Sequence, residues 1–343
     1  MTRDKTPHIT ISDREPGLPY SKGLMASQVM VTGLPAHRAY EVAEAIEERL
    51  LDQGRSSIDS AGLSVFALEV LGELAGERYS TNFARWQEVQ RLDVPLVILI
   101  GGAVGVGKST IATHLAHRLG IVRVVATDGS IREVMRAMLS PELMPSLHVS
   151  SFETDRAVRE PTRRSDALVA GFREQTQAVS VGIEAMIKRS VTEGTSIVIE
   201  GVHVVPGFFD LEVHEDRLVA VPLILEVDDE SRHLEHFAVR ETGVRPAERY
   251  ARHFDNIRKL QRYVKTQALS HGVPIVPNHS FDQALSAVLD LVMARATAWA
   301  ERHAGAERAS TAGGSTTQGH GQGRGHEHSQ QDHGQDHREG RTA

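Results

Sequence analysis

The sequence predicts an α/β protein in which a parallel five-stranded sheet is covered by helices and is preceded by a small, mainly helical domain. Three observations support this fold class. Short apolar runs alternate with long helical stretches after residue 93, amphipathic helical patterns fill the segment before residue 90, and 40% of the 343 residues are hydrophobic while 24% are charged. This composition is typical of a globular protein, and it excludes a mostly disordered chain or a collagen-like fibre.

The predicted strands are five short apolar runs separated mostly by long helical stretches. That spacing is typical of βαβ units, which bury a parallel sheet on both faces. The last gap, residues 229–271, is a long helical region. The runs are Leu96–Ile100, Arg123–Thr127, Ile197–Glu200, Val219–Glu226 and Pro274–Val276.

The first 92 residues form the predicted helical domain, and residues 93–303 form the domain that contains the sheet. A short strand is expected at His8–Ser12, and Ser60 is expected to be a helix N-cap. Apolar residues recur at three- and four-residue steps, as in an amphipathic helix. The expected helices are Lys22–Thr32, Ala36–Gln53, Ser60–Ala75 and Ala75–Gln90.

Residues 304–343 are rich in Gly, Gln, His, Ser and Thr and contain almost no bulky apolar side chain, so we expect a disordered tail. A solvated tail is the simplest interpretation. The alternative is metal binding by its histidines, which are His320, His326, His328, His333 and His337.

Charge and cysteine content restrict the possible functions further. The formal net charge is −7, without the basic excess of a dedicated nucleic-acid binder, and there is no cysteine for a disulfide, a zinc thiolate or a Cys nucleophile. The N-terminal residues contain no apolar signal sequence, and the longest apolar run, Val94–Gly107, is too short to span a bilayer. We therefore expect a cytoplasmic protein with no nucleic-acid or membrane partner.

A glycine-rich motif follows the first strand of the sheet. Residues 102–109, GAVGVGKS, match G-x-x-x-x-G-K-[ST] and lead into a predicted helix at Ser109–Leu119. In this motif, backbone N–H groups at a helix N-terminus surround phosphate oxygens, the lysine binds the β- and γ-phosphates, and the serine hydroxyl binds Mg²⁺. The alternative is a chance glycine-rich turn. The residues expected to bind the nucleotide are Gly102, Gly105, Gly107, Lys108, Ser109 and Thr110.

Carboxylates end the next two strands, where ligands of parallel sheets bind. Asp128 is a candidate base for an acceptor hydroxyl, and Arg132, one turn further on, is a candidate anion ligand. Asp128 could instead cap the following helix. Glu200 suits the Mg²⁺ side of the site together with Ser109, whereas His203 is equally compatible with a substrate contact and with an ordinary loop histidine.

An arginine-rich helical region lies between the last two strands. Such a region forms a lid over the phosphates in many kinases, although a solvated helix face explains any single arginine as well. Its arginines are Arg232, Arg240, Arg245, Arg249, Arg252, Arg258 and Arg262.

The chain resembles archaeal-type 2-phosphoglycerate kinases over about residues 8–300. The resemblance implies an ATP-cone-like domain at 1–92, a regulatory nucleotide sensor in other proteins, followed by a P-loop kinase domain with strand order 2-3-1-4-5. A helical packing or dimerisation domain is the alternative interpretation of residues 1–92. The matching segments are PYSKGL (19–24), IGGAVGVGKSTIA (100–112), TDGSIREVMR (127–136), LHVSSF (147–152), IEGVHVVPG (199–207) and NIR (256–258).

The family's reaction converts ATP and 2-phosphoglycerate into ADP and 2,3-diphosphoglycerate. The resemblance therefore implies that ATP and Mg²⁺ are held by Lys108 and Ser109, and that a small phosphorylated acceptor meets residues on the other side of the site. The implied catalytic residues are Lys108, Asp128, Arg132 and Arg240, with His148 as a further acceptor-side candidate.

The chain departs from the family pattern at two places, namely the His-rich tail and Gly129, which follows Asp128 where the pattern has Ser directly. The extra residue puts the register of Arg132 in question. Two other functions remain open, a kinase for a sugar acid or polyol and a non-catalytic nucleotide sensor. A homo-oligomer is also compatible with the sequence.

Overall fold

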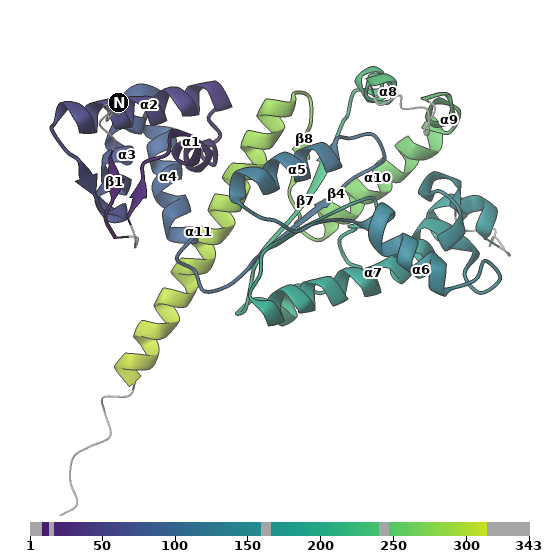
Figure 1. Cartoon of the computed structure of the whole chain (residues 1–343). Helices are drawn as coiled ribbons and strands as arrows, with labels where there is room; N and C mark the ends of the chain where they lie inside the picture. Colours follow the sequence, from purple (N-terminus) through teal and green to yellow (C-terminus); the bar gives the residue numbers. More distant parts are fainter. Residues whose placement is uncertain (1–8, 14–16, 159–165, 240–246, 314–343) are drawn as a thin grey trace, which may run out of the picture. The chain divides into compact units, whose positions relative to one another are not determined.

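The computed structural model describes residues 9–13, 17–158, 166–239 and 247–313 (Figure 1). Its main sheet has five strands in the order β5-β6-β4-β7-β8, and all neighbouring strands are parallel. This confirms the predicted α/β fold and the strand order 2-3-1-4-5. The strands are β4 (Leu96–Gly101), β5 (Val124–Ala126), β6 (Ile197–Glu200), β7 (Val219–Glu226) and β8 (Ile275–Pro277).

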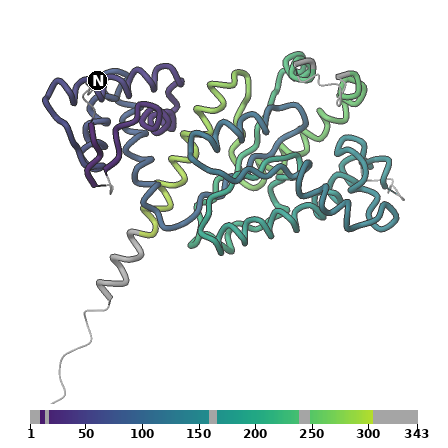
Figure 2. The backbone as a smooth tube through the Cα atoms, viewed as in Figure 1, coloured from purple at the N-terminus to yellow at the C-terminus, as the bar shows by residue number. Residues whose placement is uncertain are grey.

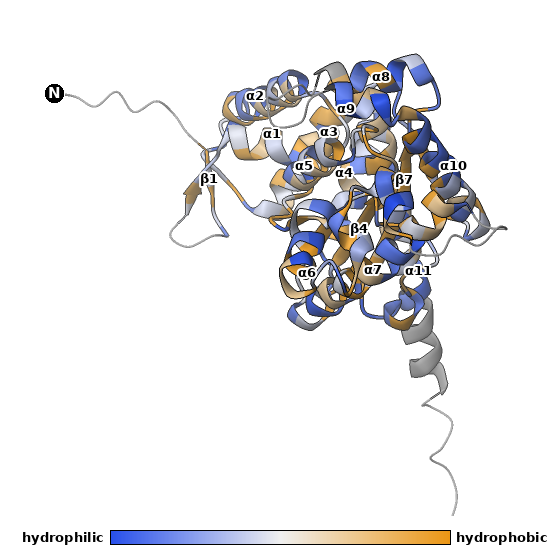
Figure 3. Cartoon of the chain, turned by 90° about the vertical axis from the view of Figure 1, so that its right-hand side faces the viewer, coloured by the Kyte–Doolittle hydropathy of each residue, from blue (hydrophilic) through white to orange (hydrophobic). Residues whose placement is uncertain are grey.

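Helices cover both faces of the sheet because successive side chains of a strand point to opposite faces. Val97 and Leu99 of β4 pack in one hydrophobic cluster with helix α7 (Ala167–Glu193). Ile98 and Ile100 pack in another cluster with α5 (Lys108–Leu119), α10 (Phe254–Ser270) and α11 (Phe281–Gly313). Figure 1 shows α7 on one side of the strands and α5 and α11 on the other, and Figure 3 shows the strands between them as hydrophobic.

The first ninety residues are mainly helical and have a hydrophobic core of their own. A three-stranded sheet of two-residue strands accompanies the helices, and only one of its strands, β1, lies within a predicted strand. The prediction that Ser60 is an N-cap is wrong, because Asp59 precedes the helix and its carboxylate accepts the N–H of Gly62. The elements are β1 (Thr10–Ile11), β2 (Leu18–Pro19), β3 (Ser57–Ile58), α1 (Lys22–Met30), α2 (Ala36–Asp52), α3 (Ser60–Ala75) and α4 (Glu77–Val89), which are the purple to blue part of the tube in Figure 2.

Contacts cross the predicted boundary at residues 92/93. Val31, Trp86 and Val89 belong to the same hydrophobic cluster as one face of the main sheet. At the end of α5, Arg118 Nη1 donates to the carbonyl of Met30, 3.1 Å away. The early helices therefore contribute directly to the core around α5.

The remaining elements are short, and several of them surround the carboxyl edge of the sheet. Asp128 and Gly129 lie in the π-helical turn η1 (Thr127–Ile131), which leads into α6 (Arg132–Met138). A π-helical turn accommodates one residue more than an α-helical turn, and Gly129 lies within this turn. The others are η2 (Pro145–His148), η3 (Ser151–Ala157), η4 (Glu212–His214), α8 (Glu230–Val239) and α9 (Ala247–Arg252).

The C-terminal helix continues beyond residue 304, where the sequence predicts that disorder begins. The rest of the predicted tail, 314–343, lies outside the described residues. None of the helices in the described ranges combines the length and apolar character needed to cross a bilayer.

Candidate active site

The glycine-rich segment forms a loop between β4 and α5, at the carboxyl edge of the sheet. Gly105 and Gly107 have positive φ angles of 87° and 89°, which L side chains rarely adopt. A Cβ atom at Gly107 would also lie 2.5 Å from Asn278 Nδ2. The loop therefore needs glycine at these positions for its shape, and α5 starts at Lys108 as a phosphate-binding loop requires.

Side chains hold four successive carbonyl groups of this loop. Lys108 Nζ donates to Ala103 O at 2.7 Å and His233 Nε2 donates to Val104 O at 2.7 Å. His236 Nδ1 donates to Gly105 O at 3.0 Å, and Asn278 Nδ2 donates to Val106 O at 2.9 Å. The carbonyls held by His233, His236 and Asn278 cannot turn toward an incoming phosphate, so these three contacts favour the anion-binding form of the loop. Sequence reasoning missed His233, His236 and Asn278, because they lie more than a hundred residues away.

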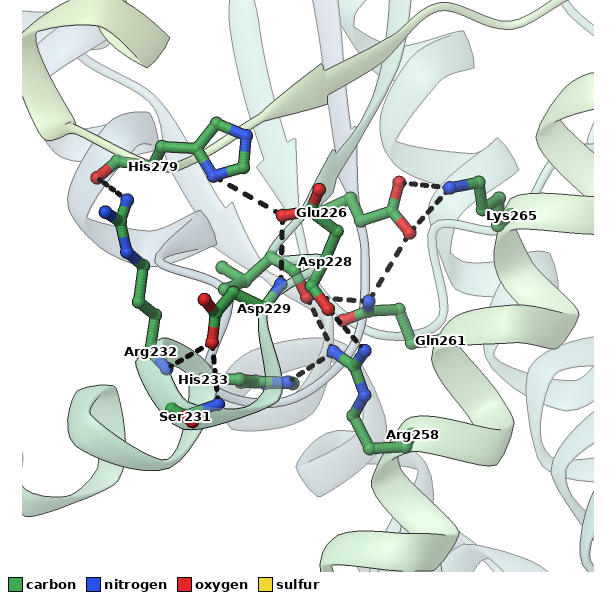
Figure 4. A network of polar contacts seen from close by, with 11 residues as sticks. Glu226, Asp228, Asp229, Ser231, Arg232, His233, Arg258, Gln261, Lys265 and His279 are labelled. Carbon is green, nitrogen blue, oxygen red and sulfur yellow. Dashed lines mark hydrogen bonds and ion pairs between the residues drawn. The ribbon is translucent and has the colours of Figure 1, made fainter.

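His233 itself is held by the network in Figure 4. It is fully buried, and burial is the main cause that lowers its pKa to about 4. The neutral ring donates from Nε2 to the loop, so Nδ1 faces Nη1 of Arg258 at 3.4 Å as an acceptor. Arg258 also donates to Val227 O and Asp228 O, each at 2.6 Å, and thereby ties α10 to the end of β7.

The described arginines of the predicted lid region make different contacts. Arg258 supports the loop, Arg232 reaches the carbonyl of His279 at 3.5 Å, and Arg249 faces a second pocket described below. Arg252 and Arg262 are exposed. Arg240 and Arg245 lie outside the described residues, so the expected role of Arg240 stays a prediction.

The buried, neutral state of His233 predicts a loss of stability in mild acid. The ordinary histidine pKa is about 6.5, so the unfolded chain binds more protons than the folded chain between pH 6.5 and 4. The contribution is complete above pH 6.5 and declines as the pH falls, by at most about 1.4 kcal/mol per pH unit. Urea unfolding at pH 7 and pH 5 measures it. We expect His233→Gln, which keeps an N–H donor, to lose less stability between these pH values than the unsubstituted protein, and equal losses would contradict this.

Ser109 and Glu200 form the candidate metal side of the site. Ser109 Oγ donates to Glu200 Oε1 at 2.8 Å, and Glu200 is buried at the end of β6. A hydroxyl and a carboxylate are the oxygen donors that Mg²⁺ accepts, usually with waters and substrate phosphates as its other ligands. The pair fits such an ion, whereas within the described ranges no cluster of three His, Asp or Glu forms a closed metal site.

A polar pocket of about 580 Å³ adjoins the loop at Val104. Its walls come from η1, α6, the segment 148–156 and α9, which lie far apart in the sequence. Among the predicted residues it brings together Asp128, Arg132 and His148. It adds cations and an anion that the sequence analysis did not assign to the acceptor side, namely Arg136, Arg156, Arg249 and Glu153.

Asp128 and Arg132 share this pocket, and each also contacts other groups of the protein. Asp128 Oδ1 lies 3.3 Å from His203 Nδ1 and 3.9 Å from Arg132 Nε, so its described contacts are with side chains and do not include a helix N-terminus. Arg132 Nη1 donates to Leu147 O and Val149 O at 3.2 and 2.7 Å, and therefore also shapes the pocket wall. His148 Nε2 donates to Leu139 O at 2.8 Å.

Glu153 gathers the other cations of the pocket. Its side chain is only 8% exposed and contacts Arg249 at 2.5 Å, Arg156 at 2.8 Å and His253 at 3.4 Å. Burial raises the pKa of Glu153, but the hydrogen bond and charge of Arg249 and the charges of His253 and Arg156 outweigh it, so the pKa is lowered. Glu153 is thus an anion that orients arginines toward the pocket.

Known proteins match the chain over most of its length. A family model described as an AAA domain matches residues 98–241, the segment that starts in β4 and contains the loop. A 2-phosphoglycerate kinase of Thermococcus kodakarensis is 38% identical over 282 residues, which are 82% of this chain and 95% of the relative. The chain belongs to the 2-phosphoglycerate kinase family.

Other members of this family are similarly close. The 2-phosphoglycerate kinase of Methanopyrus kandleri is 36% identical over 294 residues, 84% of this chain and 88% of the relative. That of Methanothermobacter thermautotrophicus is 39% identical over 271 residues, 76% and 85% of the two chains. The resemblance inferred from the motifs is confirmed, and the phosphate loop of this kinase family serves a nucleotide substrate.

A further pocket of about 260 Å³ lies in the first ninety residues, between β1, β2, α1, α3 and α4. Tyr20, Phe83 and Trp86 line it together with serine and glutamine side chains. Its described lining contains no lysine or arginine, so those residues offer no cation to a triphosphate. Nucleotide sensing by this domain stays a prediction.

Proposed function

We propose that this protein transfers the γ-phosphoryl group of ATP to the hydroxyl of 2-phosphoglycerate, which yields ADP and 2,3-diphosphoglycerate. One observation carries the proposal, namely that an arginine-lined pocket with a carboxylate at its sheet edge adjoins the phosphate loop. The names of the relatives support the same acceptor. A sensor without catalysis is not favoured, because it needs neither an acceptor pocket nor a base.

On the nucleotide side, Gly102, Gly105 and Gly107 shape the loop around the phosphates. Lys108 exchanges its contact with Ala103 O for the β- and γ-phosphates. Ser109 and Thr110 lie in the first turn of α5, and their backbone N–H groups face the same phosphates. Ser109 and Glu200 hold Mg²⁺, directly or through water. When bound, Mg²⁺ neutralises charge that develops on the phosphates.

On the acceptor side, the site must neutralise a phosphate and a carboxylate and accept one proton. Arg249 lines the pocket, and its described hydrogen bonds, to Ser150 and Glu153, both use Nη2. Planar guanidinium groups bind carboxylates and phosphates through two parallel hydrogen bonds. Arg132, Arg136 and Arg156 line the same pocket, and Arg240 remains a predicted contributor.

In the transfer step, Asp128 takes the proton of the acceptor hydroxyl while the hydroxyl oxygen attacks the γ-phosphorus. The O–H bonding pair forms the new P–O bond, and the pair of the breaking P–O bond stays on ADP. The arginines and Lys108 hold both substrates in line, which is the main contribution of such sites to catalysis.

An ADP-release assay across acceptors tests the proposed function. We expect turnover with 2-phosphoglycerate and far less with glycerate or a neutral polyol, because both lack the phosphate group and the polyol also lacks the carboxylate. Arg249→Gln should raise the KM for 2-phosphoglycerate and lower kcat/KM roughly tenfold to a hundredfold, at an unchanged KM for ATP, because one charge-assisted contact of about 1.5–3 kcal/mol is lost.

The matched control is Arg189→Gln on the exposed face of α7, where Arg189 contacts Glu193. It should leave both KM values unchanged. Equal turnover of glycerate and 2-phosphoglycerate would overturn the acceptor assignment and favour a kinase for a sugar acid or polyol.

The other assignments stay proposals of the same kind. We place an ATP-cone-like regulatory domain at 1–92, the kinase domain at 93–303 and a tail at 304–343. We also propose a cytoplasmic enzyme whose partners are small molecules rather than nucleic acid or membrane. Homo-oligomer formation is an additional expectation.

A further inference from the structure

His203 lies behind the proposed base and is completely buried. Its Nδ1 atom is 3.3 Å from Asp128 Oδ1, and its Nε2 atom is 2.9 Å from Gln175 Oε1 on α7. The ring of Phe172 stacks on it with centroids 6.1 Å apart. The imidazole thus bridges the acceptor pocket and the interior of the protein.

Gln175 determines which nitrogen of His203 carries the proton. The Gln175 amide nitrogen contacts Ser146 O at 2.5 Å and Val149 O at 3.1 Å. Both partners are backbone carbonyl groups, which only accept hydrogen bonds, so the amide must present its NH₂ group to them. Its oxygen then faces His203, and Nε2 of His203 must be the donor.

A neutral His203 therefore has no proton on Nδ1. Burial, the largest influence, together with the charges of Arg132 and Lys108, lowers the pKa of His203 to about 4, against the opposite influence of Asp128. The hydroxyl of Thr127, 3.4 Å away, is the other polar group at Nδ1. At neutral pH two acceptor atoms, Nδ1 and Asp128 Oδ1, thus face each other at a distance that one proton would bridge.

We propose that His203 is a positioning residue that stabilises the proton which Asp128 takes from the acceptor hydroxyl. The inference rests on the proposed function and extends it. The proton moves from the hydroxyl oxygen to Asp128, and the new O–H group on Oδ1 then donates to the lone pair of Nδ1. Neither Asp128 nor His203 is oxidised or reduced in this step. The proton passes to water when the product departs.

The arrangement stabilises the protonated form of Asp128 and not its ionised form. Before the reaction, Nδ1 offers the carboxylate no hydrogen bond, so the ionised form gains nothing from the ring. After proton transfer, a hydrogen bond forms between Asp128 and the fully buried ring of His203. Gln175 is necessary because the other tautomer would donate to Asp128 and weaken it as a base.

A double-mutant cycle between His203 and Asp128 tests this inference. His203→Gln replaces the basic Nδ1 atom by a far less basic amide group, and we expect kcat to fall roughly tenfold to a hundredfold with little change in either KM. The acid limb of the pH profile should move to lower pH, because the base is weaker without its partner. In the Asp128→Asn background the same substitution should have almost no further effect on kcat.

Several outcomes would overturn it. Additive losses in the cycle, or a loss of kcat without a shift of the acid limb, would mean that His203 only packs. If Asp128→Asn lowers kcat but His203→Gln does not, this inference fails and the base assignment stands. If Asp128→Asn leaves kcat unchanged, the assignment of the base in the proposed function fails as well. Thermal melting checks folding, and His203→Asn, whose amide is also a far weaker base than imidazole, repeats the cycle if His203→Gln is unfolded.

Discussion

Lys108→Ala is expected to remove most of the turnover and leave the fold intact. The Lys108 side chain is buried at the loop, where its ammonium group contacts Ala103 O. In the reaction this charge stabilises the β- and γ-phosphates, and loss of one such donor typically lowers kcat about 10²- to 10³-fold. Steady-state kinetics at saturating acceptor measure the effect.

The matched control for this substitution is Lys188→Ala. Lys188 is exposed on α7 and belongs neither to the phosphate loop nor to the acceptor pocket. It should retain full activity. Thermal melting of both variants separates catalysis from folding. Normal turnover of a correctly folded Lys108→Ala protein would disprove the assignment of the phosphate loop.

Asp128→Asn should lower kcat about 10²- to 10⁴-fold, the usual range for loss of general acid–base catalysis. The amide keeps the size of the carboxylate but cannot take the proton of the acceptor hydroxyl. ATP affinity should be unchanged, because Asp128 lies in the acceptor pocket with Arg132 and His203 as its neighbours. Pre-steady-state measurements of the transfer step report the change directly.

Asp155→Asn is the matched control, because Asp155 is an exposed carboxylate on the neighbouring turn η3. It should behave like the unsubstituted enzyme. An increase in the KM for ATP with unchanged kcat in Asp128→Asn would assign this carboxylate to nucleotide binding and not to proton transfer.

Much of the fold can be predicted from local pattern alone. Val219–Glu226 and Ile197–Glu200 are strands with the predicted bounds, because a buried parallel strand is a continuous apolar run. The sheet of β1, β2 and β3 is harder to predict, since two residues are too few for a periodic pattern. At α3, two adjacent residues, Asp59 and Ser60, are both good caps, and only the backbone geometry decides between them.

The two sides of the candidate site also differ in how well the sequence predicts them. The nucleotide side is contiguous from Gly102 to Thr110, and a motif therefore reveals it. The acceptor side combines residues from segments that folding brings together, such as Arg136, Glu153 and Arg249. Sequence alone cannot distinguish these residues from exposed charged residues. The role of His203 depends on the side chains around it, which a spacing pattern in the sequence does not reveal.

The hydrogen bond from Asn278 to the carbonyl of Val106 has a consequence for synthesis of the chain. The two residues are 172 positions apart, so the phosphate loop leaves the ribosome long before the side chain that holds it. Contacts between such distant parts form late, because a long loop must close first. The contact that holds the Val106 carbonyl can therefore form only after β8, the last strand of the sheet, has been synthesised, whereas the loop itself is present from β4 onward.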